Sequence, residues 1–260
     1  MRKDHGPSLP SHAQGEPLDR SHRGRSRFLR AVLFDMDGTL VQTEEYWGEA
    51  MFELADRLGG RMSEEARAQT VGTSMRTSMR VLYADLGLVR SEEQLLADSR
   101  WVELRTAELM AAGIPWRPGA ADLLRAVDAA GLRSALVTTT PRHIADIVLR
   151  SIRADLGGDP FDVTICGDEV PARKPDPAPS LQAMDALGVE PDQCVVVEDS
   201  DVGIAAGLAA GAAVLGVPMM QEVAPAPGLV LRDGLDGVGV PELAEVLAAG
   251  RAARAERWAG

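Results

Sequence analysis

The sequence predicts an α/β protein in which a Rossmann-like parallel sheet forms the core and an α-helical cap domain is inserted into it. Two features of the 260 residues support this prediction. Short apolar runs that end in polar residues alternate with helical patterns, which is the βαβ rhythm of a parallel sheet with helices on both faces. A long helical stretch separates the first run from the second, and no proline occurs between Pro17 and Pro115.

Each apolar run is expected to be a buried strand, and the five strands cover residues 30–35, 133–139, 161–168, 193–200 and 211–217. Helices are expected between the later strands, at about 141–151, 177–187 and 202–210. The stretch from Val240 onward is typical of a closing helix that packs on the sheet edge. Parallel sheets bind ligands at the carboxyl ends of their strands, where this sequence places its polar clusters.

The chain is expected to divide into a disordered basic arm, a first part of the core, the helical cap and the rest of the core, over residues 1–28, 29–42, 43–116 and 117–260. Apolar residues recur at helical spacing in the cap, at Trp47, Ala50, Met51, Leu54 and Leu58. An insert that begins beside a polar site is well placed to act as a lid. The alternative is a helical subdomain that contributes only stability.

Composition limits the partners and the compartment. The formal net charge of −12 argues against broad nucleic-acid binding by the folded part. The polar arm reads as disordered, with a basic tether to nucleic acid or to an anionic surface, a solvated extension and a start codon placed too early as alternatives. No apolar stretch is long enough to cross a bilayer or to act as a secretory signal. Cys166 and Cys194 lie in apolar runs, so we expect reduced thiols in a cytoplasmic protein, and we expect it to be a monomer.

The first polar cluster, "DMDGT", places Asp35 and Asp37 directly after the first strand. A calcium loop beginning at Asp35 fails, because Tyr46 stands at the twelfth position, where a bidentate glutamate is required. A plain Asp-Gly turn explains one aspartate but not both. As a chemical site, Asp35 would be a carboxylate nucleophile toward a phosphoryl group and Asp37 an acid/base, while Gly38 allows a sharp turn.

The second cluster contains Thr138 and Thr139, at the point where a strand ends and a helix begins. Helix capping alone would explain it, but free N–H groups at a helix start also attract an anion. The third cluster contains Lys174, the only lysine after Lys3. A surface lysine is the ordinary alternative, yet a compact ammonium suits phosphate oxygens as a point charge.

The fourth cluster places Glu198 and Asp199 directly after "VVV". Two adjacent carboxylates at the end of a buried strand repel each other unless a cation lies between them, and Mg²⁺ prefers such ligands. A helix cap accounts for Ser200 or Asp201 but not for this pair. All four clusters lie in order at strand ends, and together they supply what phosphoryl transfer needs, namely positioning, a divalent cation and donors for the phosphoryl oxygens.

These motifs resemble those of the haloacid dehalogenase-like superfamily, over about residues 29–217. The resemblance is to its phosphatase branch with a helical cap, the beta-phosphoglucomutase-like and sugar-phosphate phosphatase group. It implies that Asp35 is the nucleophile, that Asp37 is the general acid/base, and that Thr138, with Thr139 beside it, and Lys174 orient the phosphate. It also implies that Mg²⁺ is held by Asp35, the main-chain carbonyl of Asp37 and Asp199, with Glu198 in or near the metal shell.

The sequence departs from the phosphoglucomutase pattern at one place. There a cap histidine assists the sugar hydroxyl, whereas "TEEYW" puts Trp47 at that position and resembles the cap start of hexitol and deoxysugar phosphate phosphatases. Trp47 is a candidate wall for substrate specificity, with core packing as the alternative. Arg76, Thr140 and Arg142 are further candidates for contacts with the substrate or the cap.

The expected function is Mg²⁺-dependent hydrolysis of a small phosphomonoester, a sugar or polyol phosphate, through an aspartyl-phosphate intermediate. A sugar phosphomutase is the first alternative, and Trp47 argues against it. A dehalogenase needs one aspartate and no metal, so Asp37, Glu198 and Asp199 argue against that reaction. A non-catalytic module that binds a phosphorylated ligand is the alternative from another class.

Overall fold

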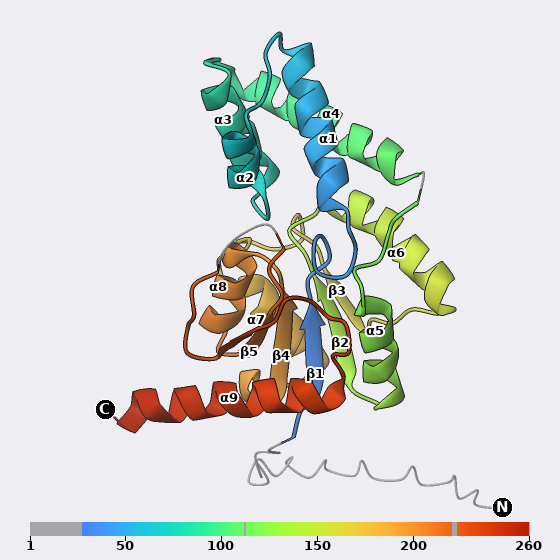
Figure 1. Ribbon diagram of the computed structural model, residues 1–260, viewed down its shortest axis with the longest axis vertical. Helices are drawn as coiled ribbons and strands as arrows, with labels where there is room; N and C mark the ends of the chain where they lie inside the picture. Colours follow the sequence, from blue (N-terminus) through green and yellow to red (C-terminus); the bar gives the residue numbers. More distant parts are fainter. Residues whose placement is uncertain (1–27, 112, 220–222, 260) are drawn as a thin grey trace, which may run out of the picture.

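The computed structural model describes residues 28–111, 113–219 and 223–259, and its core is a parallel sheet of six strands (Figure 1). The strand order is β3-β2-β1-β4-β5-β6, and the strands are β1 (Ala31–Phe34), β2 (Arg133–Val137), β3 (Val163–Ile165), β4 (Cys194–Glu198), β5 (Ala213–Gly216) and β6 (Leu229–Leu231). The first strand thus lies at the centre, between β2 and β4. It is buried on both faces, as expected for a strand without polar alternation.

Helices cover both faces of the sheet. Alternate β1 residues point to opposite faces, so Val32 and Phe34 join one apolar cluster while Ala31 and Leu33 join another. The first cluster is completed by α5 (Ala120–Ala129), α6 (Arg142–Leu156) and α9 (Val240–Ala259). The second is completed by α7 (Ala178–Leu187) and α8 (Asp201–Ala209), with the short 3-10 helix η1 (Pro191–Gln193) before β4. The predicted α/β fold class is confirmed.

Four helices lie beyond the carboxyl edge of the sheet, and we call them the cap helices: α1 (Glu44–Arg57), α2 (Glu64–Thr70), α3 (Met75–Asp85) and α4 (Glu92–Met110) (Figure 1). The last three begin after a serine whose hydroxyl accepts an N–H of the first turn, at Ser63, Ser74 and Ser91. The four cap helices share an apolar cluster of their own, which contains the apolar residues of α1 that were predicted at helical spacing.

The two chain segments that join the cap helices to the core are paired with each other. Val41 forms a bridge with Trp116, and Arg117 N–H donates to the Leu40 carbonyl at 2.9 Å. Gln42 N–H donates to the Pro115 carbonyl at 2.8 Å. The outgoing and returning segments therefore run side by side.

The five predicted strands are present and shorter than expected: their last residues leave the sheet to form the polar loops, and all except β2 also begin one or two residues later than predicted. β6 and α5 were not among the expected elements. β6 is three residues long and only partly buried, so it has little apolar signal. The predicted closing helix is α9, which packs on β5 and β6 and also reaches β4. Residues 1–27 of the predicted arm lie outside the described residues. Among the described helices, none is long and apolar enough to cross a membrane.

Candidate active site

Strand register brings the predicted clusters to one edge of the sheet. Phe34 is aligned with Leu136 on one side and with Val197 on the other. The residues that follow these positions are Asp35, Thr138 after Val137, and Glu198 with Asp199. Because the three strands are neighbours and parallel, their polar ends converge.

Lys174 lies at the centre of this convergence. Its Nζ donates to Asp35 Oδ1 at 2.6 Å, to the Val137 carbonyl at 2.7 Å and also to Glu198 Oε1. The lysine side chain is 4% exposed and that of Glu198 is fully buried. A buried ammonium needs such partners, because an unpaired charge away from water is costly. The third cluster is therefore tied directly to the first and the fourth.

Glu198 is held on both of its carboxylate oxygens. Oε1 accepts from Lys174, and Oε2 accepts from Ser200 Oγ at 3.2 Å and from Asp199 N–H at 3.2 Å. These donors belong to the two residues that precede α8, and the N-terminus of that helix also favours an anion. Glu198 is thus placed to orient Lys174 as well as to contribute charge.

The carboxylates of Asp35, Glu198 and Asp199 offer oxygen atoms that all lie within 4.8 Å of one another. With Lys174 they carry a formal charge of −2 when all are ionised, and a divalent cation would balance this charge. Oxygen donors of this kind suit Mg²⁺. Burial raises the pKa of Asp35 well above its ordinary value, and the Glu198 charge raises it further, against the effect of Lys174. Burial together with the Glu198 charge raises the pKa of Asp199 to about 7. The residues fit the predicted metal.

Gly38 makes this arrangement possible. Its φ is +84°, which only glycine adopts without strain, and a Cβ there would lie 2.3 Å from Asp199 Oδ2. The next residue, Thr39, donates from Oγ1 to Asp199 Oδ1 at 2.9 Å. The loop after β1 therefore packs directly against the carboxylate supplied by the loop after β4.

The Asp37 carboxylate is not part of the group of three carboxylates and has its own donors. Oδ1 accepts from Thr43 Oγ1 at 2.5 Å and from Trp47 Nε1 at 3.2 Å. Oδ2 accepts from Thr140 Oγ1 at 2.7 Å, and Thr138 Oγ1 lies 3.5 Å away. The two aspartates therefore differ sharply in surroundings. Asp35 lies among charges, while Asp37 accepts neutral donors from the start of α1 and the loop after β2.

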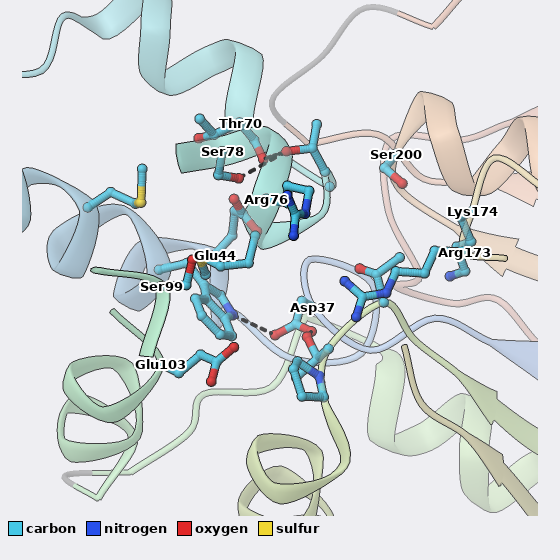
Figure 2. Close-up of a pocket in the computed structure, with 18 of the residues that line it drawn as sticks. Asp37, Glu44, Thr70, Arg76, Ser78, Ser99, Glu103, Arg173, Lys174 and Ser200 are labelled. Carbon is cyan, nitrogen blue, oxygen red and sulfur yellow. Dashed lines mark hydrogen bonds between the residues drawn. The ribbon is translucent and has the colours of Figure 1, made fainter. Parts of the chain in front are cut away.

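A cavity of about 290 Å³ lies between the polar edge of the sheet and the cap helices (Figure 2). Its core side includes Asp35, Asp37, Thr139, Thr140 and Lys174. The Arg173 side chain also lines it, and its Nε donates to the Gly167 carbonyl at 2.6 Å. All the described reactive groups of the first three clusters except Thr138 thus line the same cavity. Thr138 is buried behind it and accepts the Thr140 N–H at 3.1 Å.

The cap side of the cavity carries a buried ion pair. Arg67 donates to Glu44 Oε1 at 2.8 Å, to the Glu44 carbonyl at 2.7 Å and to Thr70 Oγ1 at 2.8 Å. Burial raises the pKa of Glu44, and the Arg67 charge opposes this rise. Gly48 lies beneath the guanidinium, where a Cβ would approach Arg67 Nε to 2.7 Å. The ion pair therefore depends on a glycine in α1.

The specificity candidates are placed differently from one another. Trp47 and Thr140 line the cavity and donate to Asp37, and Trp47 also packs against the apolar clusters of the core and cap. Arg76 lines the cavity and pairs with Glu92. Arg142 is not among the lining residues: its guanidinium donates to Glu169 at 2.6 and 2.7 Å, on the flank of the sheet. The geometry does not bring Arg142 to phosphate or to the cap side of the cavity.

Several groups at the cavity had no signal in the sequence. Arg67 lies 23 residues from Glu44, and no local pattern links the two. Thr43 precedes α1 at the usual capping position, but its hydroxyl makes no cap hydrogen bond and is used on Asp37 instead. Ser99 and Glu103 lie four residues apart on one face of α4, which looks like an ordinary solvated face, yet both line the cavity.

Comparison with known proteins agrees with this geometry. A family model described as haloacid dehalogenase-like hydrolase matches residues 29–211. The chain is 35% identical to protein CbbY of Rhodobacter capsulatus over 194 residues, 73% of this chain and 86% of that protein. It is 34% identical to phosphoglycolate phosphatase of Rhodospirillum rubrum over 194 residues, 72% of this chain and 78% of that enzyme. A crystal structure of a CbbY mutant from Rhodobacter sphaeroides in complex with xylulose-(1,5)-bisphosphate aligns with a TM-score of 0.72 and 29% identity, covering 83% of this chain and 99% of the other.

Proposed function

We propose that this chain, which belongs to the haloacid dehalogenase-like hydrolases and is a phosphatase, depends on Mg²⁺ and hydrolyses phosphomonoesters. Its substrate would be a small phosphorylated metabolite, a sugar or polyol phosphate. The relatives support a small phosphate ester, since their names and bound ligand include phosphoglycolate and a sugar bisphosphate. The observation that carries the proposal is the buried group of Asp35, Glu198 and Asp199 beside Lys174, from which Asp35 and Lys174 reach the lining of the cavity under the cap helices.

Asp35 is assigned as the nucleophile. One of its oxygens would form a bond to phosphorus while the bond from phosphorus to the leaving oxygen breaks, which gives an aspartyl-phosphate. Lys174 holds the attacking carboxylate in place by its bond to Oδ1, and its charge favours the negative phosphoryl oxygens. Asp35 and Asp199 would hold Mg²⁺ with Glu198 beside them, and the main-chain carbonyl of Asp37 stays a predicted ligand. The ion would supply positive charge to the phosphoryl group.

Asp37 is assigned as the general acid and base. Its carboxyl would give a proton to the leaving oxygen and then accept a proton from the water that attacks the aspartyl-phosphate. Hydroxyl and indole donors hold both of its oxygens, so its position is fixed by Thr43, Trp47 and Thr140. Thr138 and Thr139 are assigned to the phosphate. Thr139 lines the cavity, and Thr138 supports the same loop by accepting the Thr140 N–H.

Hydrolysis is favoured over phosphate return to the sugar. A mutase needs a cap group that exchanges a proton with the substrate hydroxyl, and the position of that histidine is occupied by Trp47. An indole N–H is a donor only and takes no proton. In this structure it is already used on Asp37. The buried thiols of Cys166 and Cys194 support the proposed reducing, cytoplasmic setting.

The test is phosphate release from a panel of phosphorylated metabolites, measured as kcat/KM with Mg²⁺ and with EDTA. We expect turnover with Mg²⁺ only. Asp35→Asn should lose turnover while its circular dichroism spectrum stays unchanged and its unfolding midpoint is equal to or higher than that of the wild type. Asp122→Asn, which changes an exposed carboxylate on α5, is the matched control and should keep full activity. Normal turnover in Asp35→Asn would remove the assigned nucleophile, and equal turnover in EDTA would remove the metal.

A further inference from the structure

The cap wall of the cavity contains a buried hydroxyl without a protein partner. Ser99 on α4 is 9% exposed and lines the cavity, and its Oγ has no hydrogen-bond partner among the described residues (Figure 2). A serine inside a helix can satisfy its hydroxyl by donating to the carbonyl four residues earlier, and Ser99 does not. Thr106 Oγ1 on the same helix also lacks a partner in the described part of the chain, but of these two residues only Ser99 lines the cavity, so a group bound there would be placed to satisfy the Ser99 hydroxyl.

The charges near Ser99 indicate what that partner is. Glu103 lies one turn further along α4 and lines the same wall. Its Oε2 is 3.4 Å from His143 Nε2, a partner that carries a full charge only when protonated. The cap helices contribute two guanidinium groups to the described cavity lining, and both are paired, Arg67 with Glu44 and Arg76 with Glu92. The cap wall therefore offers hydroxyls and carboxylates, and each of its two guanidinium groups is paired with a carboxylate, Arg67 in a buried pair and Arg76 in an exposed one.

The core side of the cavity carries positive charge, in contrast to the cap wall. Lys174 and Arg173 lie there, beside the assigned nucleophile. One end of the cavity is thus suited to a phosphoryl group. The other end would repel a second anionic group and would accept neutral hydroxyls, which can both donate to a carboxylate and pair with a serine.

We propose that the leaving group of the substrate is neutral and polyhydroxylated, carrying no second phosphate or carboxylate, and that Ser99 hydrogen-bonds one of its hydroxyls. This inference rests on the proposed phosphatase function and names the substrate class for it. Ser99 acts as a specificity-determining residue and Glu103 excludes anionic tails. The xylulose bisphosphate ligand of the R. sphaeroides CbbY mutant belongs to the other class, so the two proteins are expected to differ in preference.

The first experiment compares Ser99→Ala with Thr106→Val. Thr106 Oγ1 on the same helix is also buried without a partner but does not line the cavity, so it controls for loss of a buried hydroxyl. The readout is the ratio of kcat/KM for fructose 6-phosphate or ribulose 5-phosphate to kcat/KM for p-nitrophenyl phosphate, which has no hydroxyl on its leaving group. Ser99→Ala should lower this ratio about 3- to 10-fold, the size of one neutral hydrogen bond, and Thr106→Val should not. Equal ratios in the two variants would overturn the role of Ser99.

The second experiment tests the charge of the wall. Wild-type enzyme should prefer fructose 6-phosphate to fructose 1,6-bisphosphate and ribulose 5-phosphate to ribulose 1,5-bisphosphate. Glu103→Gln should narrow both preferences several-fold, whereas Glu108→Gln, which changes an exposed glutamate of α4 that lies outside the cavity lining, should leave them unchanged. A wild-type preference for the bisphosphates would overturn the inference. Hydrolysis of p-nitrophenyl phosphate alone would also overturn it while the phosphatase function stands, and no Mg²⁺-dependent hydrolysis of any ester would overturn both.

Discussion

Replacement of Lys174 by methionine tests the charge arrangement of the site through protein stability. Methionine keeps most of the side-chain volume and removes only the ammonium, so packing changes little. The side chain is 4% exposed and pairs with both Asp35 and Glu198. Its loss takes the formal charge of the cluster from −2 to −3 and leaves two buried carboxylates without their cation. Removal of one partner of a buried ion pair costs about 3–5 kcal/mol, so we expect Lys174→Met to lower the free energy of unfolding by about that amount.

The measurement is urea unfolding at pH 8 in EDTA, with Arg125→Met as the control. Arg125 pairs with Asp122 on the surface at 3.0 Å and its side chain is 55% exposed, so its loss should cost no more than about 1 kcal/mol. At pH 5.5 the penalty of Lys174→Met should shrink, because the pKa of Asp35 is raised and a proton can replace the lost ammonium charge. A Lys174→Met protein within about 1 kcal/mol of wild type at pH 8 would refute the electrostatic account of the site.

Three further predictions concern other parts of the molecule. Gly48→Ala should lower the free energy of unfolding by about 1–2 kcal/mol, although alanine has the better helix propensity, because the new Cβ displaces the Arg67 guanidinium from Glu44. Urea unfolding measures this loss, and a variant more stable than the wild type would contradict the prediction. The pKa of Asp199 is about 7 in the folded protein and has its ordinary value in the unfolded chain, so the metal-free protein should lose stability as the pH rises from about 4 to 7. The rise in Tm on adding Mg²⁺ should therefore be larger at pH 8 than at pH 5.5, and equal rises would contradict this prediction. Deletion of residues 1–27 should leave kcat/KM unchanged, because the assigned site residues begin at Asp35, and lost activity would give the arm a role in turnover.

The core of the fold was predictable because each central strand is a continuous apolar run that ends in polar residues. β1, β2 and β4 carry both the strongest hydrophobic signal and the groups of the site, so fold and site could be inferred from the same residues. β6 escaped prediction because three half-buried residues at a sheet edge give no periodicity. α5 escaped it because it lies just past the cap, where the helical insert and the core adjoin in sequence.

Residue types at the strand ends indicated the site, and the register of a parallel sheet explains why they meet. Asp35, Glu198 and Asp199 could be placed together because β1 and β4 pair side by side. The cap wall could not be predicted in the same way. Whether Ser99 or Glu103 faces solvent or a cavity depends on how α4 is rotated against α1, and a single polar helix face does not specify that rotation.

The pairing of Val41 with Trp116 joins the segment that leads into the layer of cap helices to the segment that leads out of it. The chain therefore enters and leaves that layer at one place on the core, and α4 packs on α6 as a second contact. Helices in that layer can be lengthened, shortened or exchanged without changing the gap that the sheet must bridge. The groups at the sheet edge can in this way be combined with different covers, whereas Asp37, which accepts a hydrogen bond from Trp47 of α1, ties the assigned acid/base to the cover that is present.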